Sequence, residues 1–310
     1  GTLTNALLAE NALNNASSSA SDAEAALRRS KNYANVWSPK RLFFCPRSSA
    51  AASAGGSDRR GDDGAVEGSL QCPASPASLV LDKPFYKEGD AWHYAYWVPH
   101  DMPAVVSTLF PTPQHFDAQL NALMTESEAF ADQWGEALPN KYYWAGNEHN
   151  LLDPWLFNYG PNCSHTQEWV RALSKRHYSS GPRGLPGNDD YGALSSWFVW
   201  SALGLFPNAG SAYFLVGSPR VKSATIQLTQ LLVNGVGGGD DDDDGTSSQN
   251  PVLRIVAVNN SATNVYVEAM TVDGEPVTSP FLHRSALERG ALLEFTMTDS
   301  PYQRGICGGS

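Results

Sequence analysis

The sequence has little positive charge and no long hydrophobic run. Its 310 residues include 21 Lys and Arg against 32 Asp and Glu, which gives a formal net charge of −11. This deficit excludes a nucleic acid as partner, because such partners need a basic surface. No apolar stretch approaches the roughly 20 residues that cross a bilayer, which excludes a membrane span.

Cysteine is scarce as well. The four cysteines, Cys45, Cys72, Cys163 and Cys307, form no CxxC pair, which argues against a zinc site. One or two disulfides are possible among them, and a bond from Cys45 to Cys72 would close a low-complexity loop. The sequence also lacks an initiating Met and a signal peptide, and we interpret it as a processed product or a fragment.

Two stretches lack the apolar residues that a packed core needs. Residues 48–69 are of low complexity and predict a surface insertion, and residues 234–250 hold five consecutive aspartates and predict a disordered acidic loop. Sequons at Asn15, Asn162 and Asn259 favour a secreted glycoprotein.

Aromatic residues, in contrast, are plentiful. Nine tryptophans occur, aromatic residues make up 11% of the chain, and hydrophobic residues reach 42%. The length is enough for two domains with buried cores. Tryptophan is good core material, and its flat apolar faces also suit the C–H faces of sugars, so both interpretations of a given ring stay open.

The hydrophobic pattern predicts a mainly α part followed by a β region. Residues 1–210 have the pattern of helices joined by long loops, whereas residues 211–310 have the composition of strands. Three strands are predicted, the second followed by a hairpin turn at Asp273-Gly274: Val252–Val258, Asn264–Val272 and Leu292–Met297.

Helices are predicted at four places in the first part, and Ser21 with Glu24 forms a possible capping box for the first of them. Ser164 and Gln167 have the spacing of a capping box, which predicts a helix start. Another helix is predicted after Asp190, with its end near Gly204. Four apolar residues have helical spacing and predict a helix with one buried apolar stripe: Phe116, Leu120, Leu123 and Met124.

Three stretches combine acids and amides with aromatic rings and glycine: Phe85–Asp101, Tyr142–Tyr159 and Gly184–Trp197. None has clean helical or strand periodicity over its polar part. A carboxyl crowded by rings loses solvation and keeps its proton to a higher pH. A protonated and an ionised carboxyl on either side of a bond are the groups that glycoside hydrolysis uses.

Simpler interpretations of the same acids stay open. Asp189 and Asp190 also suit the N-cap of the following helix, where their oxygens would accept from free N–H groups. With Asn188 they also suit a structural cation, although the loop lacks the pattern of an EF-hand. Glu88 also suits an exposed surface position, and Glu148 a helix cap.

The polar, aromatic stretches belong to a set of four ordered blocks: EGDAWHYAYWVPHD, AGNEHNLLDPWLFNY, TQEWVR and GLPGNDDYGALSSWFVWSALGLFP. In order and spacing they resemble glycoside hydrolase family 92, the calcium-dependent, inverting α-mannosidases. The resemblance implies an (α/α)6 toroid, here partial, followed by strands of a C-terminal β-sandwich. It also implies that this chain is a C-terminal portion whose partner is a missing N-terminal β-sandwich.

The resemblance assigns roles by motif. Glu88 matches the general acid, Asp190 the general base, and Asp189 a neighbour that assists or holds the water. Asn147 and Glu148 are assigned to the surroundings of Ca²⁺, the implied cofactor. Seven further side chains are assigned to substrate binding: Trp92, His93, His100, Asp101, Trp144, His149 and Asn188.

The function that the resemblance implies is exo-hydrolysis of terminal mannose from a glycan, of the N-glycan type and with α-1,2 linkages as one option. The alternative is a non-catalytic carbohydrate-binding or structural remnant, inactive because the N-terminal half is missing. A third option is another carbohydrate enzyme built on an α/α barrel. Asp90 and His93 stand where the family commonly has amides, which leaves the preferred pH and linkage open.

Overall fold

The computed structural model describes residues 17–47, 70–73, 86–135, 139–228, 251–301 and 306–307, with side chains from residue 22. The chain divides into two compact units that interleave along the sequence. The predicted insertion at 48–69 and the predicted acidic loop at 234–250 lie outside the described residues. The segments of each unit are as follows: unit 1 holds Gly1–Gly160, Leu185–Asp189 and Ala209–Ser211, and unit 2 holds Pro161–Gly184, Asp190–Asn208 and Ala212–Ser310.

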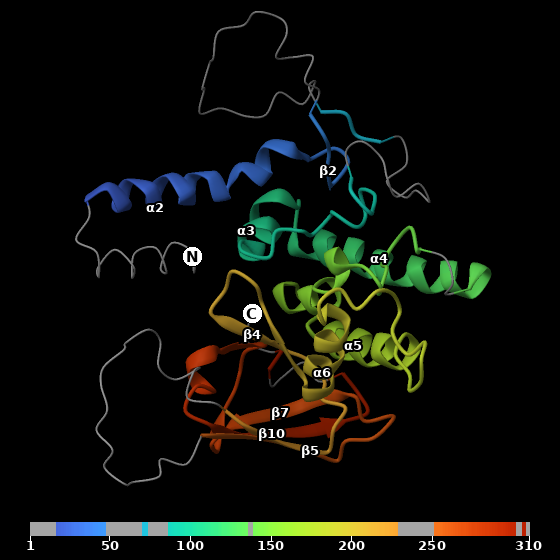
Figure 1. The fold of residues 1–310 in the computed structure, drawn as a ribbon, viewed down its shortest axis with the longest axis vertical. Helices are drawn as coiled ribbons and strands as arrows, with labels where there is room; N and C mark the ends of the chain where they lie inside the picture. The colour runs from blue at the N-terminus through green and yellow to red at the C-terminus, as the bar shows by residue number, and fades with distance from the viewer. Residues whose placement is uncertain are drawn as a thin grey trace, which may run out of the picture. The chain divides into compact units, whose positions relative to one another are not determined.

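The described part of unit 1 is built from α-helices, short 3-10 helices, one π-helical turn (η4) and one two-stranded ribbon (Figure 1). The ribbon is antiparallel and pairs Trp37 with Phe44. The elements are α2 (Ser17–Ser30), η1 (Asn32–Val36), β1 (Trp37–Ser38), β2 (Phe43–Phe44), α3 (Met102–Ala104), η4 (Val105–Leu109), α4 (Pro113–Trp134), η5 (Glu148–Asn150) and η6 (Asp153–Tyr159).

Helix α4 carries the core of unit 1. It begins where the Thr112 side chain accepts from the backbone N–H of His115, with Pro113 in the first turn, and it ends at Gly135, whose φ is 81°. The predicted apolar stripe is confirmed, because its four residues are at most 1% exposed. This face contacts η6, whose Trp155, Leu156 and Phe157 are fully buried.

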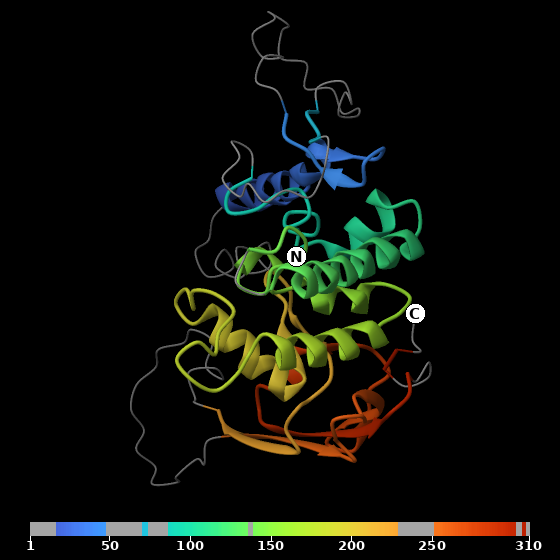
Figure 2. The ribbon, with the colours of Figure 1, turned by 90° about the vertical axis from the view of Figure 1, so that its right-hand side faces the viewer.

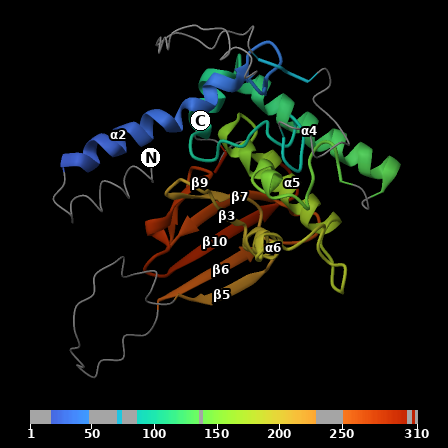
Figure 3. The same cartoon turned by 45° about the horizontal axis from the view of Figure 1, so that its top comes forward.

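The described residues of unit 2 form two sheets, two α-helices and one short 3-10 helix. The larger sheet has the order β5-β6-β10-β7-β8, in which β6 and β10 are parallel and the other neighbours antiparallel (Figure 3). Helix α5 contacts β7 of this sheet and also α6 (Figure 2). The elements are α5 (Ser164–Arg176), α6 (Ala193–Leu203), β3 (Leu205–Pro207), β4 (Tyr213–Val216), β5 (Ser223–Gln227), β6 (Val252–Val258), β7 (Tyr266–Val272), β8 (Glu275–Pro276), β9 (Phe281–His283), η8 (Arg284–Ala286) and β10 (Ala291–Thr298).

The three predicted strands are confirmed as β6, β7 and β10, with bounds that differ by two residues or fewer. Alternate residues of β10 are buried, as a strand with one covered face requires. The predicted hairpin turn is confirmed as well. Asp273 and Gly274 have φ values of 50° and 86°, and β7 pairs with β8 across them.

Helix α5 starts at the predicted residue for a different reason. The capping box is wrong, because the N-cap is Cys163 and no side chain caps the helix. Gln167 is 1% exposed, and its side-chain oxygen accepts from the backbone N–H of Val267, 2.9 Å away. Val267 lies where the pairing of β7 with β10 shifts register. Gln167 therefore accepts from a backbone N–H at the irregular part of the ladder.

Helix α6 ends as predicted. Gly204 is its C-cap with a φ of 78°, and a Cβ there would lie 2.7 Å from the backbone nitrogen of Pro219. Glycine therefore satisfies both the left-handed conformation and the close approach of the chain.

All four cysteines form disulfides. Cys45 bonds to Cys72 in unit 1, as the sequence indicated, and Cys163 bonds to Cys307 in unit 2. Among the described residues no helix is both long and apolar enough to cross a membrane.

The role of Gln167 predicts the outcome of its replacement. Gln167→Leu keeps a side chain of similar size but leaves the buried N–H of Val267 without its acceptor. The free energy of unfolding should therefore fall by about 1–3 kcal/mol. Chemical denaturation followed by far-UV circular dichroism measures this change. Lys175→Ala, at an exposed residue of the same helix, is the matched control, and equal stability of the two variants would contradict the assigned role.

Candidate functional site

Glu88 lies in an exposed, left-handed turn. Its φ is 53°, which is uncommon for a residue other than glycine. Gly89 follows and is buried, and a Cβ there would lie 2.9 Å from the Cβ of His93. The turn thus presents the Glu88 side chain to solvent while the backbone beneath it is tightly packed. Glu88 is thus exposed, although the stretch that carries it is rich in aromatic rings.

A buried polar pair supports the turn from below. Asp90 is 2% exposed, and its Oδ1 accepts from the backbone N–H groups of Trp92 and His93 and lies 3.0 Å from His93 Nδ1. The other ring nitrogen of His93, Nε2, donates to the carbonyl of Asn140 at 2.9 Å. Both ring nitrogens of His93 are therefore engaged inside unit 1.

Asn147 joins the second predicted stretch to the Glu88 turn. It is 2% exposed, and its Nδ2 donates to the backbone carbonyl of Glu88 at 2.7 Å. Its Oδ1 lies 3.0 Å from Nδ1 of His149. The His149 ring packs against Tyr94 and Trp97, with centroids 4.4 and 5.4 Å apart. Burial lowers the pKa of His149, the charge of His93 adds to this, and Glu88 opposes it.

The third predicted stretch reaches the second through glycines. A Cβ on Gly146 would lie 2.6 Å from the backbone oxygen of Pro186, and one on Gly187 would lie 2.8 Å from the oxygen of Gly146. The two loops thus touch backbone to backbone within unit 1. This contact places exposed Asn188 and half-buried Asp189 next to the loop that carries Asn147.

Asp190 follows Asp189 in the chain and begins the second segment of unit 2. It is exposed, and with Tyr191 and Gly192 it forms three consecutive residues of positive φ, at 42°, 60° and 88°. The N-cap interpretation of Asp190 is wrong, because Gly192 is the N-cap of α6 and no side chain caps that helix. Strained backbone of this kind gathers at functional sites, which favours a functional role for Asp190.

The remaining predicted substrate-binding residues differ in what they contact. Trp92 packs edge-on against Phe43, with ring centroids 4.8 Å apart, and half-buried Trp144 lies edge-on to His93 at 6.5 Å. His100 and Asp101 instead hold the segment after α2. His100 Nε2 donates to the carbonyl of Ser30. Asp101 Oδ2 accepts from Nζ of Lys31 and from the phenol hydroxyl of Tyr33.

The motifs did not single out the polar residues that hold the second stretch in place. Asn150 is fully buried, accepts from the backbone N–H of Trp144 and donates to Asp153 Oδ2 at 2.7 Å. Complete burial raises the pKa of Asp153 well above its usual value, and the bond from Asn150 partly opposes this. Asn140 accepts from the backbone N–H of Tyr142 and donates to Ser127. The spacing of Asn150 and Asp153, three residues apart, is the signal that could have indicated their bond.

The predicted calcium surroundings have suitable chemistry. Asn147 offers an amide oxygen and half-buried Glu148 a carboxylate, and hard cations such as Ca²⁺ prefer oxygen ligands. Asp189 and Asn188 supply further oxygens on the adjoining loop. The described residues contain no group of three or more His, Cys, Asp or Glu that would hold a metal by itself.

Comparison with known proteins gives one family. The sequence profile of the glycosyl hydrolase family 92 catalytic domain matches residues 5–299. A curated relative from Arthroderma benhamiae, named an uncharacterized secreted glycosidase, is 23% identical over 224 residues, which are 72% of this chain and 25% of that protein.

Solved structures show the same fold. A family GH92 α-mannosidase from Bacteroides thetaiotaomicron in complex with mannoimidazole matches with a TM-score of 0.71 and 23% identity, covering 93% of this chain and 34% of that one. A family GH92 inverting mannosidase from the same organism matches with a TM-score of 0.69 and 22% identity, covering 91% and 35%. The chain thus spans about a third of the length of these structures.

The glycine contact predicts the effect of one added methyl group. Gly146→Ala would drive a Cβ into the Pro186 carbonyl, so the two loops should separate. We expect hydrogen exchange, read by mass spectrometry, to accelerate several-fold in residues 144–150 and 185–189. Gly135→Ala is the control, because a Cβ there meets no atom within 4 Å although its φ is also positive. Unchanged exchange in Gly146→Ala would refute the contact.

Asp153 predicts a dependence of stability on pH. Its pKa is raised in the folded chain, so between about pH 4 and its folded pKa the folded state holds a proton that the unfolded state has released. Stability should therefore fall as pH rises through this window. Asp153→Asn should remove that slope and raise the thermal midpoint at neutral pH, as scanning calorimetry measures. Glu24→Gln, at an exposed carboxyl, should leave the slope unaltered.

Proposed function

Because the chain belongs to glycosyl hydrolase family 92, we propose that it is an exo-α-mannosidase that removes terminal mannose from glycans by single displacement. The observation that carries this proposal is the meeting, within unit 1, of the first two predicted stretches with residues 185–189 of the third. The Asn147 amide ties the second stretch to the Glu88 turn, and Gly146 and Gly187 bring the third stretch against the second. N-glycans with α-1,2 linkages are the substrate class that we expect.

The proposed reaction uses two carboxyls. Protonated Glu88 gives its proton to the glycosidic oxygen as the bond from that oxygen to C1 breaks. Asp190 takes a proton from a water molecule whose oxygen forms the new bond to C1 from the opposite face, and Asp189 helps to hold this water. The products are the shortened glycan and mannose of inverted configuration. Such a mechanism needs roughly 6.5–9.5 Å between the carboxyls, to leave room for the water.

Backbone geometry supports both assignments. Glu88 and Asp190 are exposed and have positive φ, and each is followed closely by glycine. A left-handed residue is held there only when its surroundings over-determine the turn. For Glu88 the bond from Asn147 and the packing of Gly89 on His93 supply this constraint. Such a turn fixes the direction in which the side chain leaves the backbone, which favours the positioning that acid–base catalysis requires.

The calcium assignment also belongs to the proposal. Asn147 and Glu148 would hold Ca²⁺, which would bind sugar hydroxyls and favour a distorted ring. The finer architecture is proposed on the same basis: a partial (α/α)6 toroid over residues 1–210 and β-sandwich strands over 211–310. Secretion fits the naming of the Arthroderma benhamiae relative as a secreted glycosidase.

Substitution of the two acids tests their roles. Glu88→Gln and Asp190→Asn should each lower kcat on an α-1,2-linked mannobiose by a factor of about 10² to 10⁴. On an aryl mannoside, whose leaving group needs little protonation, Glu88→Gln should lose much less than Asp190→Asn. Glu275→Gln, at an exposed glutamate, is the control.

The measurement is mannose release by the complete chain, with the anomer read by proton NMR and Ca²⁺ removed or restored. Normal rates in either variant would overturn its assignment. A chain that binds mannosides but releases no mannose would instead favour the non-catalytic alternative.

A further inference from the structure

Unit 1 contains an aromatic pocket beside the Glu88 turn. Its volume is about 250 Å³, and five aromatic residues line it: Tyr33, Phe44, Tyr86, Tyr94 and Trp97. This volume lies just below the range of about 300–1,000 Å³ typical of drug-sized ligands. The pocket therefore suits a small ring such as one hexose.

The wall of this pocket is connected to the Glu88 turn by the chain itself and by a hydrogen bond. Tyr86 precedes Glu88 by two residues, and the hydroxyl of Tyr94 donates to the backbone carbonyl of Lys87 at 2.7 Å. The Tyr86 and Tyr94 rings lie against each other, with centroids 5.5 Å apart. A ligand that fills the pocket would therefore lie next to the residue that we propose as general acid.

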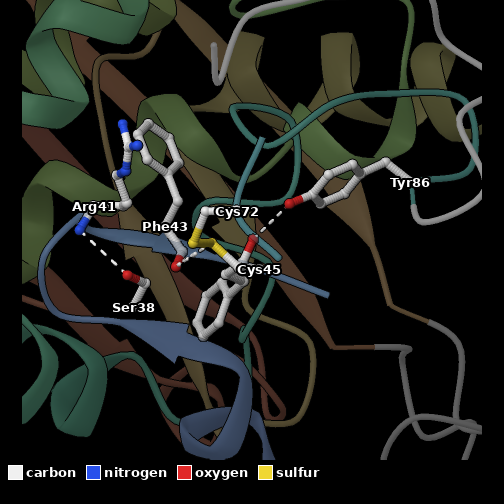
Figure 4. Close-up of a disulfide and its surroundings, with 7 residues drawn as sticks. Ser38, Arg41, Phe43, Cys45, Cys72 and Tyr86 are labelled. Carbon is white, nitrogen blue, oxygen red and sulfur yellow. Dashed lines mark hydrogen bonds between the residues drawn. A yellow bond between two sulfur atoms is a disulfide. The ribbon is translucent and has the colours of Figure 1, made fainter. Parts of the chain in front are cut away.

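The tyrosine hydroxyls of the pocket are already engaged. Tyr86 donates to the carbonyl of Phe44 at 2.7 Å (Figure 4), and burial and the nearby charge of Asp90 raise its pKa to about 12, so it stays protonated. Tyr33 donates to Asp101. What the pocket offers a ligand is thus mainly the apolar surface of its rings, which stacks on the C–H face of a pyranose.

The pocket is also held in shape. Cys45 contributes to its wall and is bonded to Cys72, next to the strand that carries Phe44 (Figure 4). Trp97 is 44% exposed, although His149 packs against it. An indole kept half in solvent within a constrained aromatic pocket is a surface ready for a ligand, because little ordering remains to be done on binding.

From these observations we propose that the aromatic pocket binds the leaving-group sugar, the residue to which the terminal mannose is attached. This inference rests on the proposed function. A general acid protonates the oxygen of the leaving group, so the sugar that departs lies on the side of the acid. The pocket adjoins Glu88 through Tyr86 and Tyr94, and Trp97 provides the exposed stacking face.

The test compares two substrates in the complete chain. An α-linked mannobiose carries a sugar as leaving group, whereas α-mannosyl fluoride carries an ion that cannot fill the pocket. Trp97→Ala should lower the ratio of kcat/KM for mannobiose to kcat/KM for the fluoride about five- to tenfold. Trp97→Phe keeps a ring and should restore most of the ratio. Trp134→Ala, at a tryptophan that is 59% exposed at the end of α4, should leave the ratio unaltered.

The outcomes separate the two proposals. An unaltered ratio in Trp97→Ala, with both substrates cleaved, would overturn the pocket assignment and leave the proposed function intact. If the unsubstituted chain cleaved neither of the two substrates, the proposed function would be overturned, and the pocket assignment with it. A lowered ratio that Trp97→Phe does not restore would also contradict stacking as the mode of binding.

Discussion

The rest of the candidate site depends on the hydrogen bond that the side-chain amide of Asn147 donates to the backbone carbonyl of Glu88. Its Nδ2 holds the carbonyl of Glu88, and its Oδ1 faces Nδ1 of His149. A single planar group thus fixes a left-handed turn and an imidazole ring at once. An aspartate in this place would keep the acceptor but lose the donor, and the Glu88 carbonyl would be left without this buried partner. Through His149 the same amide also sets the position of Tyr94 and Trp97.

Close backbone contact extends this arrangement to the third stretch. Gly146 and Gly187 leave no room for a Cβ, so the loops that they belong to are as near as two backbones can lie. Such contact fixes the loops without a side chain between them, and it holds exposed Asn188 and half-buried Asp189 beside the loop that carries Asn147. Sequence motifs rich in glycine therefore mark here the places where chain segments meet.

The sequence predicted features that depend on local pattern. Alternation located β6 and β10, helical spacing located the buried face of α4, and Gly204 marked the end of α6. The capping-box interpretation of Gln167 was wrong because its partner, Val267, lies 100 residues away in a strand that the pattern could not pair. The site shows the same division. Motifs indicated that Glu88, Asn147 and Asp189 belong together. The Asn140 amide, however, donates to the carbonyl of Ser127 and Asn150 accepts from the N–H of Trp144, contacts that only the folded chain brings about.

The polar residues under the Glu88 turn are mostly neutral amides, and this has a physical consequence. Asn140, Asn147 and Asn150 satisfy backbone groups without adding charge beneath an acid. Asp90 is the buried carboxylate closest along the chain, and it lies against His93 and accepts from two backbone N–H groups. A lone buried charge would act strongly across a medium of low dielectric constant, whereas a carboxylate whose oxygen is bonded in this way acts less. The turn is therefore held from below mainly by neutral groups.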